Sequence, residues 1–223
     1  FSLPRIDKNS LVVPDRFEDI CRRQSVASEH FRTVAGFDAV NLDLCDSVSS
    51  SRRRRSGDTY YNAILELLSF QVEKRVEPWL LFLTSRCGAG NVDVGDLKLL
   101  NQCIEKNELA SEEFRAAVMQ LLSQDGGSEE SSEEDRAHLS HLRRFSLGIG
   151  KWLLQTMDTA TPRWGVEMRP GHHYRVKNPC DMVSLAFIFR PQVARPHDPS
   201  GLASQGNVGC HTTEVQYGLA MIE

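Results

Sequence analysis

Apolar residues in the middle of the chain recur at the spacing of helices. From Ile64 to Val76 they fall at three- and four-residue intervals behind Asp58, which we expect to cap the helix. Pro78 ends or kinks this helix and suits the first turn of another, which would contain the apolar run 79–83. The pattern therefore predicts two helices separated by Pro78.

Further helical patterns follow. Asp96 and Ser111 each precede one, and we expect both to be capping residues. The helix after Ser111 has the clearest amphipathic stripe in the chain, which consists of Phe114, Ala117, Val118, Leu121 and Leu122. A longer helix is predicted over about 136–157, with Gly148 and Gly150 weakening its middle. Short connections between these helices predict an array of antiparallel neighbours.

After Pro162 the helical spacing of apolar residues gives way to shorter segments, which predict β-strands. These segments are 165–168, 173–176, 182–189 and 213–222. Residues 183–189 are nearly all apolar, which predicts a central strand that is covered on both faces. Two N-terminal segments, 11–13 and 37–44, also have the character of strands.

We therefore expect an α+β fold in a single domain, residues 1–223. A central helical array, about 58–124 and 136–157, would join an antiparallel sheet formed mainly by the C-terminal third, with the N-terminal strands added to it. Two segments have too few apolar residues to offset the entropy of ordering them, and we expect both to be flexible. They are the serine- and arginine-rich loop 46–57 and the acidic linker 125–136.

Composition narrows the class of protein. The chain has 223 residues, of which 40% are hydrophobic, and its net charge of −4 argues against a molecule that binds polyanions as a whole. No run of about 18 apolar residues occurs, so no transmembrane segment is expected. The six cysteines include no C-x-x-C pair, which favours a reducing compartment, nuclear or cytoplasmic. Because the chain begins at Phe1 and shows no signal peptide, we expect it to be a fragment of a longer protein.

The strongest local charge is a run of four arginines: Arg52, Arg53, Arg54 and Arg55. These guanidiniums could bind phosphate on nucleic acid or on a phosphorylated partner, or serve as a nuclear-import or docking signal. No aromatic residue is interleaved with them to stack bases, and a solvated loop without a binding role is the alternative. Ser25, Ser56 and Ser146 follow basic residues in the manner of kinase substrates, and phosphate on Ser56 would offset the adjacent positive charge.

One set of residues has the chemistry of metal ligands: His172, His173, Cys180, Cys210 and His211. Imidazole and thiolate are ligands of zinc. Adjacent residues in a strand point to opposite faces, however, so each adjacent pair is poorly placed to bind one metal ion. The sequence leaves open whether these residues bind zinc. No other cofactor is expected, and no nucleophile elbow, phosphate loop or dinucleotide motif occurs, so we do not expect an enzyme.

These patterns together predict a non-enzymatic intracellular domain for protein–protein interaction or regulation. We expect a partner segment to dock in an apolar groove between helices, with the arginine loop as an electrostatic or regulatory accessory. The residues expected around this groove are Trp79, Leu80, Phe82, Phe114 and Val118. Each of them would also suit an ordinary core. The alternatives are a nucleic-acid-binding protein that uses Arg52–Arg55 and a zinc-stabilised domain.

Overall fold

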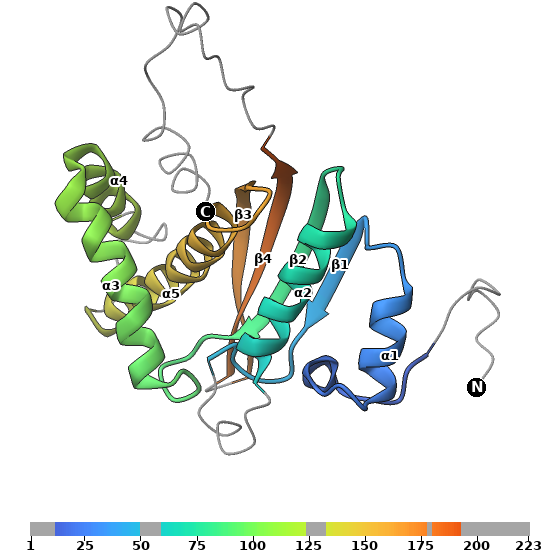
Figure 1. Cartoon of the computed structure of the whole chain (residues 1–223). Coiled ribbons are helices and arrows are strands. Elements are labelled where there is room, and N and C mark those ends of the chain that lie inside the picture. The colour runs from blue at the N-terminus through green and yellow to red at the C-terminus, as the bar shows by residue number, and fades with distance from the viewer. Residues whose placement is uncertain (1–11, 50–58, 124–132, 178–179, 193–223) are drawn as a thin grey trace, which may run out of the picture.

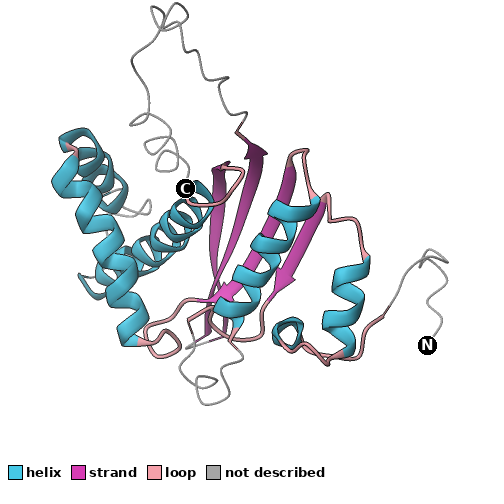
Figure 2. Ribbon diagram, in the orientation of Figure 1, coloured by secondary structure: helices cyan, strands magenta, loops and turns pink. Residues whose placement is uncertain are grey.

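The computed structural model describes residues 12–49, 59–123, 133–177 and 180–192, and within them the fold is α+β (Figure 1). The elements are, in chain order, the 3-10 helix η1 (Phe17–Cys21), α1 (Val26–Thr33), β1 (Ala39–Asp43), α2 (Tyr60–Lys74), β2 (Trp79–Arg86), α3 (Val94–Ala110), α4 (Glu112–Ser123), α5 (Glu133–Asp158), β3 (Trp164–Lys177) and β4 (Cys180–Pro191). The predicted class is confirmed, because helices fill the middle of the chain and C-terminal strands are joined by N-terminal ones (Figure 2).

The strands that the structure describes form one sheet in the order β1-β2-β4-β3. β2 pairs with β4, and β4 with β3, in antiparallel fashion. Among these described strands, the β1–β2 pair departs from the antiparallel sheet that we expected: it is parallel, because α2 carries the chain back to the starting end of the sheet. The predicted strands 165–168 and 173–176 are parts of β3, separated by a register shift between Arg169 and His172.

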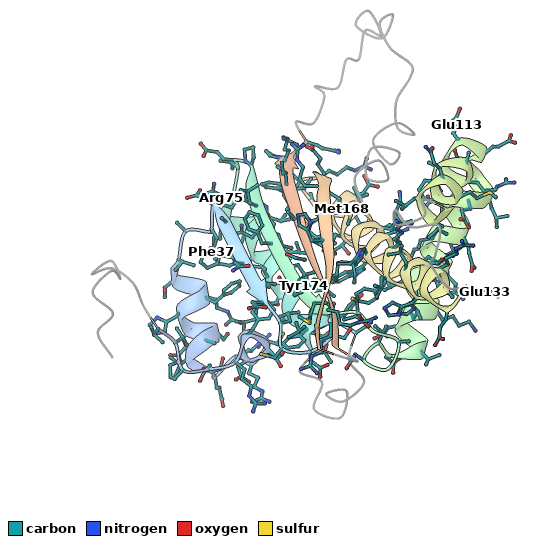
Figure 3. All side chains as sticks on the ribbon, turned by 180° about the vertical axis from the view of Figure 1, so that it is seen from behind. Phe37, Arg75, Glu113, Glu133, Met168 and Tyr174 are labelled. Carbon is teal, nitrogen blue, oxygen red and sulfur yellow. The ribbon has the colours of Figure 1, made fainter. Side chains whose placement is uncertain are left out.

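The α-helices α2 and α5 lie on one face of the sheet, and α3 and α4 pack on α5 (Figure 1). The sheet therefore has a helical side and a second side, which Figure 3 shows from behind the molecule. No helix of the described residues covers this second side, which we call the open face. Antiparallel and mixed sheets often have one such face.

Residues 79–86 form β2, which corrects the helix that we expected after Pro78. Burial alternates along the strand, and Trp79, Leu81 and Leu83 are at most 1% exposed on the helical side. Residues 79–83 are all apolar, so their hydrophobic pattern does not distinguish a helix from a strand. Its neighbours decide the structure, because β1 and β4 supply backbone hydrogen-bond partners on both sides.

The amphipathic stripe of α4 is confirmed as a buried face. Phe114, Val118 and Leu121 are buried, and the other two residues of the stripe pack against the core. Ser111 is confirmed as the cap of this helix, because its Oγ accepts a hydrogen bond from the backbone N–H of Phe114 at 3.1 Å. Such a bond satisfies a backbone donor that the helix itself leaves unpaired.

The caps of α2 and α3 are close to the expected residues but differ from them. Thr59 rather than Asp58 caps α2, with its side chain accepting from the backbone N–H of Asn62. Asp93 rather than Asp96 caps α3, and its carboxylate accepts from two backbone N–H groups of the first turn. Neighbouring residues of the same capping chemistry explain both shifts.

Gly148 and Gly150 do not interrupt α5. A Cβ at Gly148 would lie 2.7 Å from the Cβ of Leu100 in α3, and one at Gly150 would lie 2.9 Å from the Sδ of Met168 in β3. Both glycines therefore permit close approach, one to the neighbouring helix and the other to the sheet. The loss of helix propensity is offset by this tighter packing.

Parts of the two segments expected to be flexible are ordered. Ser47, Val48 and Ser49 are buried, and the backbone N–H of Val48 donates to the Oγ of Ser85 at 3.0 Å. Residues 133–136 form the first turn of α5. Residues 50–57 and 125–132 of these segments lie outside the described residues, as does the predicted strand 213–222. Among the helices that the structure describes, none combines the length and the apolarity needed to span a bilayer.

Candidate interaction surface

The groove that we expected between helices is filled. Trp79, Phe114 and Val118 are each at most 1% exposed and belong to the hydrophobic core. The ring of Trp79 stacks on that of Phe189 with centroids 4.0 Å apart. The Nζ of Lys151 lies 4.4 Å from the centroid of the Phe114 ring. These three residues therefore do not line an opening, because their neighbours occupy the space around them.

Leu80 and Phe82 lie on the open face instead. They alternate with the buried residues of β2 and are 36% and 42% exposed. In the register between β2 and β4, Leu80 is opposite Ile188 and Phe82 is opposite Ala186. Both β4 residues are half-buried. These four side chains form an apolar strip along the middle of the open face, which we call the central strip.

The central position of β4 is confirmed, but the described residues cover only one of its faces. Val183, Leu185 and Phe187 point to the helical side and are at most 1% exposed. The intervening Ala186 and Ile188 are half-buried on the open face. The expectation of cover on both faces is therefore wrong for the part of the chain that the structure describes.

Charged residues flank the central strip, and the two flanks differ in sign. On the β1 side, Asp43 is exposed and pairs with Thr84, so it shares the open face. On the β3 side, the carboxylate of Glu167 is bridged by Arg169, at 2.8 Å, and by Arg190. Two guanidiniums against one carboxylate leave this flank positive. The open face thus has an apolar centre, a single carboxylate, that of Asp43, on its β1 side and a net positive β3 side.

His172 and His173 point to opposite faces of β3. His172 pairs with Ser184 and is exposed on the open face. His173 pairs with Val183 and faces α5, where its Nε2 lies 2.9 Å from the Oγ of Ser146. Two adjacent histidines with this geometry do not converge on one ion.

The other predicted zinc ligands give no support to a metal site. The side chain of Cys180 and the whole of Cys210 and His211 lie outside the described residues. Within the described ranges, no group of three or more His, Cys, Asp or Glu side chains is placed to hold a metal ion. The zinc prediction is weakened by the divergence of His172 and His173 and is otherwise untested.

The contact between Ser146 and His173 joins α5 to the sheet. Burial lowers the pKa of His173, the backbone carbonyl of Leu142 raises it, and the charges of Arg143 and His172 lower it, with a net downward direction. The imidazole is therefore neutral at neutral pH. The Oγ of Ser146 donates to the carbonyl of Leu142 at 3.0 Å, and the serine is fully buried. Because no surface reaches this hydroxyl, the pair is a packing contact rather than an exposed nucleophile and base.

A second polar cluster ties α5 to the β3–β4 hairpin. The carboxylate of Asp181 accepts from the Nε of Arg175 at 2.8 Å and lies 3.3 Å from the Nε2 of His138. Burial raises the pKa of Asp181, but the hydrogen bonds and positive charges of Arg175 and His138 outweigh that effect and hold the pKa below its usual value. The ion pair between Arg175 and Asp181, and the contacts of both with His138 of α5, brace the end of the hairpin against the helix.

The remaining predicted sites divide between the described and the undescribed parts of the chain. Ser25 caps α1 and accepts from the backbone N–H of Ser28 at 2.9 Å, whereas Ser146 is buried. Ser56 and the run Arg52–Arg55 lie outside the described residues. The predicted roles of the arginine run therefore stay predictions.

Sequence reasoning missed Ala186 and Ile188, although a signal for them was present. Within 183–189, a large side chain alternates with Ser184, Ala186 and Ile188, of which the first two are small. This alternation indicates a strand whose two faces have different surroundings. The apolar character of the whole run concealed it.

The model of the PP_RS20740-like family matches residues 1–223, the whole chain. No curated protein and no solved structure matches the chain. The family match thus includes every strand of the open face.

Proposed function

The chain belongs to the PP_RS20740-like family, and we propose that it is a non-enzymatic protein–protein interaction domain that binds a partner polypeptide on the open face of its sheet. The partner would cover the central strip, and the charged flanks would orient it. The helical side would act as the scaffold that keeps the strands in register.

The exposure of Leu80 and Phe82 at the centre of the open face carries this proposal. A solvated sheet face is normally built from polar side chains, whereas here the middle positions are Leu, Phe, Ala and Ile. An apolar centre with a charged rim is the anatomy of a protein interface. A contiguous apolar patch of this kind on the surface of a folded domain often marks an interaction site.

A reducing location, nuclear or cytoplasmic, belongs to the same proposal. Cys45, which is exposed, and Cys103, which is half-buried, form no disulfide in the described part of the chain. Cysteines at such accessible positions suit a compartment in which disulfides do not form.

A photo-crosslinking amino acid in place of Phe82 tests the proposed surface in the cells that express the protein. We expect a covalent adduct with a defined polypeptide from position 82 and none from Met119, which is exposed on α4. Leu80→Asp should remove the adduct, because a carboxylate in the central strip would be desolvated by the partner. Equal labelling from both positions, or no adduct from position 82, contradicts the proposal.

Binding of the polypeptide thus identified would then be measured with purified components. Phe82→Asp is expected to raise the dissociation constant by at least about tenfold, or about 1.4 kcal/mol. Met119→Asp introduces the same charge on the helical side and should leave the constant unchanged. A constant that responds equally to both variants would place the contact elsewhere.

The alternative functions have no support from the described residues. Nucleic-acid binding depends on Arg52–Arg55, and its test is a binding constant that falls steeply with salt and is lost when all four are changed to alanine. Zinc stabilisation predicts about one zinc per chain by elemental analysis and a loss of stability with chelator.

A further inference from the structure

We propose that the polypeptide that covers the open face is a second copy of this chain, related to the first by a two-fold axis parallel to the strands. This inference rests on the proposed function and specifies its partner. It follows from the fit between the open face of one copy and the same face of a second, symmetry-related copy. Three properties of that face bear on the inference: the register of apolar residues, the sign of the flanks and the size of the face.

A symmetric face-to-face dimer has its two-fold axis in the plane between the sheets, because each copy presents the same surface to the other. Packed sheets lie about 10 Å apart, with their strands aligned to within about 30°. Two orientations of the axis keep the strands aligned. An axis across the strands places each strand opposite itself, whereas an axis along the strands places β1 opposite β3 and β2 opposite β4 of the second copy.

The central strip is complementary to itself when the axis runs along the strands. Phe82 is level with Ala186, and Leu80 is level with Ile188, in the register of β2 and β4. Exchange of β2 with β4 then places Phe82 of each copy over the small Ala186 of the other. Leu80 lies over Ile188 in the same way. A large side chain over a small one lets two layers interdigitate, and symmetry gives each such contact twice.

The charged flanks select the same orientation. With the axis along the strands, Asp43 of one copy faces the β3 edge of the other, where His172 is level with it and Arg169 lies in the next row. With the axis across the strands through the row of Phe82, Arg169 would lie opposite Arg169 of the second copy, and Asp43 would lie opposite Ala39 rather than a basic residue. Like charges opposite one another destabilise an interface, so the charges favour the arrangement with the axis along the strands.

The size of the face indicates a weak dimer. Four strands about 4.8 Å apart give a width of about 19 Å, and the eight residues of β2 extend about 26 Å. The footprint is roughly 500 Å² per copy. Both copies together bury about 1,000 Å², near the lower limit of specific interfaces. We therefore expect a weak dimer whose population depends on protein concentration.

Sedimentation equilibrium of two charge-reversal variants, alone and mixed, tests the proposal on the full chain. Asp43→Lys and Arg169→Glu are both exposed substitutions, and far-UV circular dichroism confirms that each variant is folded. Each variant alone would oppose like charges twice, so its dimerisation constant should weaken by about tenfold or more relative to the unmodified chain. In the mixture, the introduced lysine of one variant would face the introduced glutamate of the other, and the retained Arg169 would face the retained Asp43. A mixed dimer should therefore form with nearly the original affinity.

The control variant Glu105→Lys carries the same charge change on α3 and should dimerise like the unmodified chain. A chain that stays monomeric at all accessible concentrations overturns the proposal, as does a mixture that fails to restore the dimer. A crosslink from position 82 to a different protein, together with a monomeric chain, would leave the proposed function standing and remove only the second copy. The absence of any crosslink from that position would contradict both.

Discussion

His172 and His173 show that a shift of one position along a strand changes the surroundings of a side chain completely. The two side chains are adjacent in sequence, yet one is exposed on the open face and the other contacts Ser146 of α5. Burial lowers the pKa of His173. Nothing in the dipeptide itself distinguishes the two, since the difference comes from which face the helices cover.

Acid should destabilise the protein through His173. Its pKa is lower in the folded chain than in the unfolded chain, so the unfolded chain binds the proton first as the pH falls below about 6.5. The free energy of unfolding should therefore fall as the pH is lowered from 7 towards 5. Urea unfolding at several pH values measures this slope. His173→Gln should be less stable at pH 7 but have a smaller slope.

The matched control for this experiment is His30→Gln, in α1, where the imidazole is exposed. This substitution should leave the slope unchanged. The lowered pKa of Asp181 acts in a more acidic range, below about 4, and does not overlap with the histidine window. An equal slope in the unmodified chain and His173→Gln would show that the buried imidazole is not the cause.

Lys151 is a buried cation, and its effect on stability is expected at alkaline rather than acidic pH. Burial lowers its pKa to about 8. Between about pH 8 and 10.5 the unfolded chain holds the proton more tightly, so stability should rise with pH across that window. Lys151→Met should raise the free energy of unfolding at pH 7 by about 1 kcal/mol, because it removes a desolvated charge, and it should abolish the rise. Lys98→Met, at an exposed position of α3, should do neither; a less stable Lys151→Met chain at pH 7 would contradict this account.

At the scale of elements, local patterns predicted structure well where the deciding contacts are local. The stripe of α4 and the cap at Ser111 needed only the spacing of residues along one helix. β2 was assigned to a helix because its five leading apolar residues have no period, and the strand exists because β1 and β4 lie on either side of it. Those partners are distant in sequence, so no local pattern reports them.

Adjacent alanine substitutions in β2 test its alternation of faces. Leu81→Ala removes a fully buried side chain and should lower the free energy of unfolding by about 3 kcal/mol. Phe82→Ala removes a larger but exposed side chain and should lower it by less than about 1 kcal/mol in the monomer. Chemical unfolding at low protein concentration measures both. Costs of similar size would show that the two residues do not face different surroundings.

At the scale of the whole molecule, the sequence identified two of the four residues of the central strip. Leu80 and Phe82 were expected at a binding surface, but in a groove between helices. Their companions on β4 were expected to be covered on both faces. The open face depends on α2 and α5 lying on the same side of the sheet, which is a property of the complete fold rather than of any segment.

Oxidative footprinting of the protein in dilute solution and inside cells measures most directly whether the open face is an interaction surface. Phe82 and Tyr174 report on that face, and Tyr61 and Met119 report on exposed parts of the helices. The account predicts that all four are labelled in the dilute isolated chain and that only Phe82 and Tyr174 are protected in cells. Protection of Phe82 already in the dilute chain, or equal labelling of all four in cells, would contradict it.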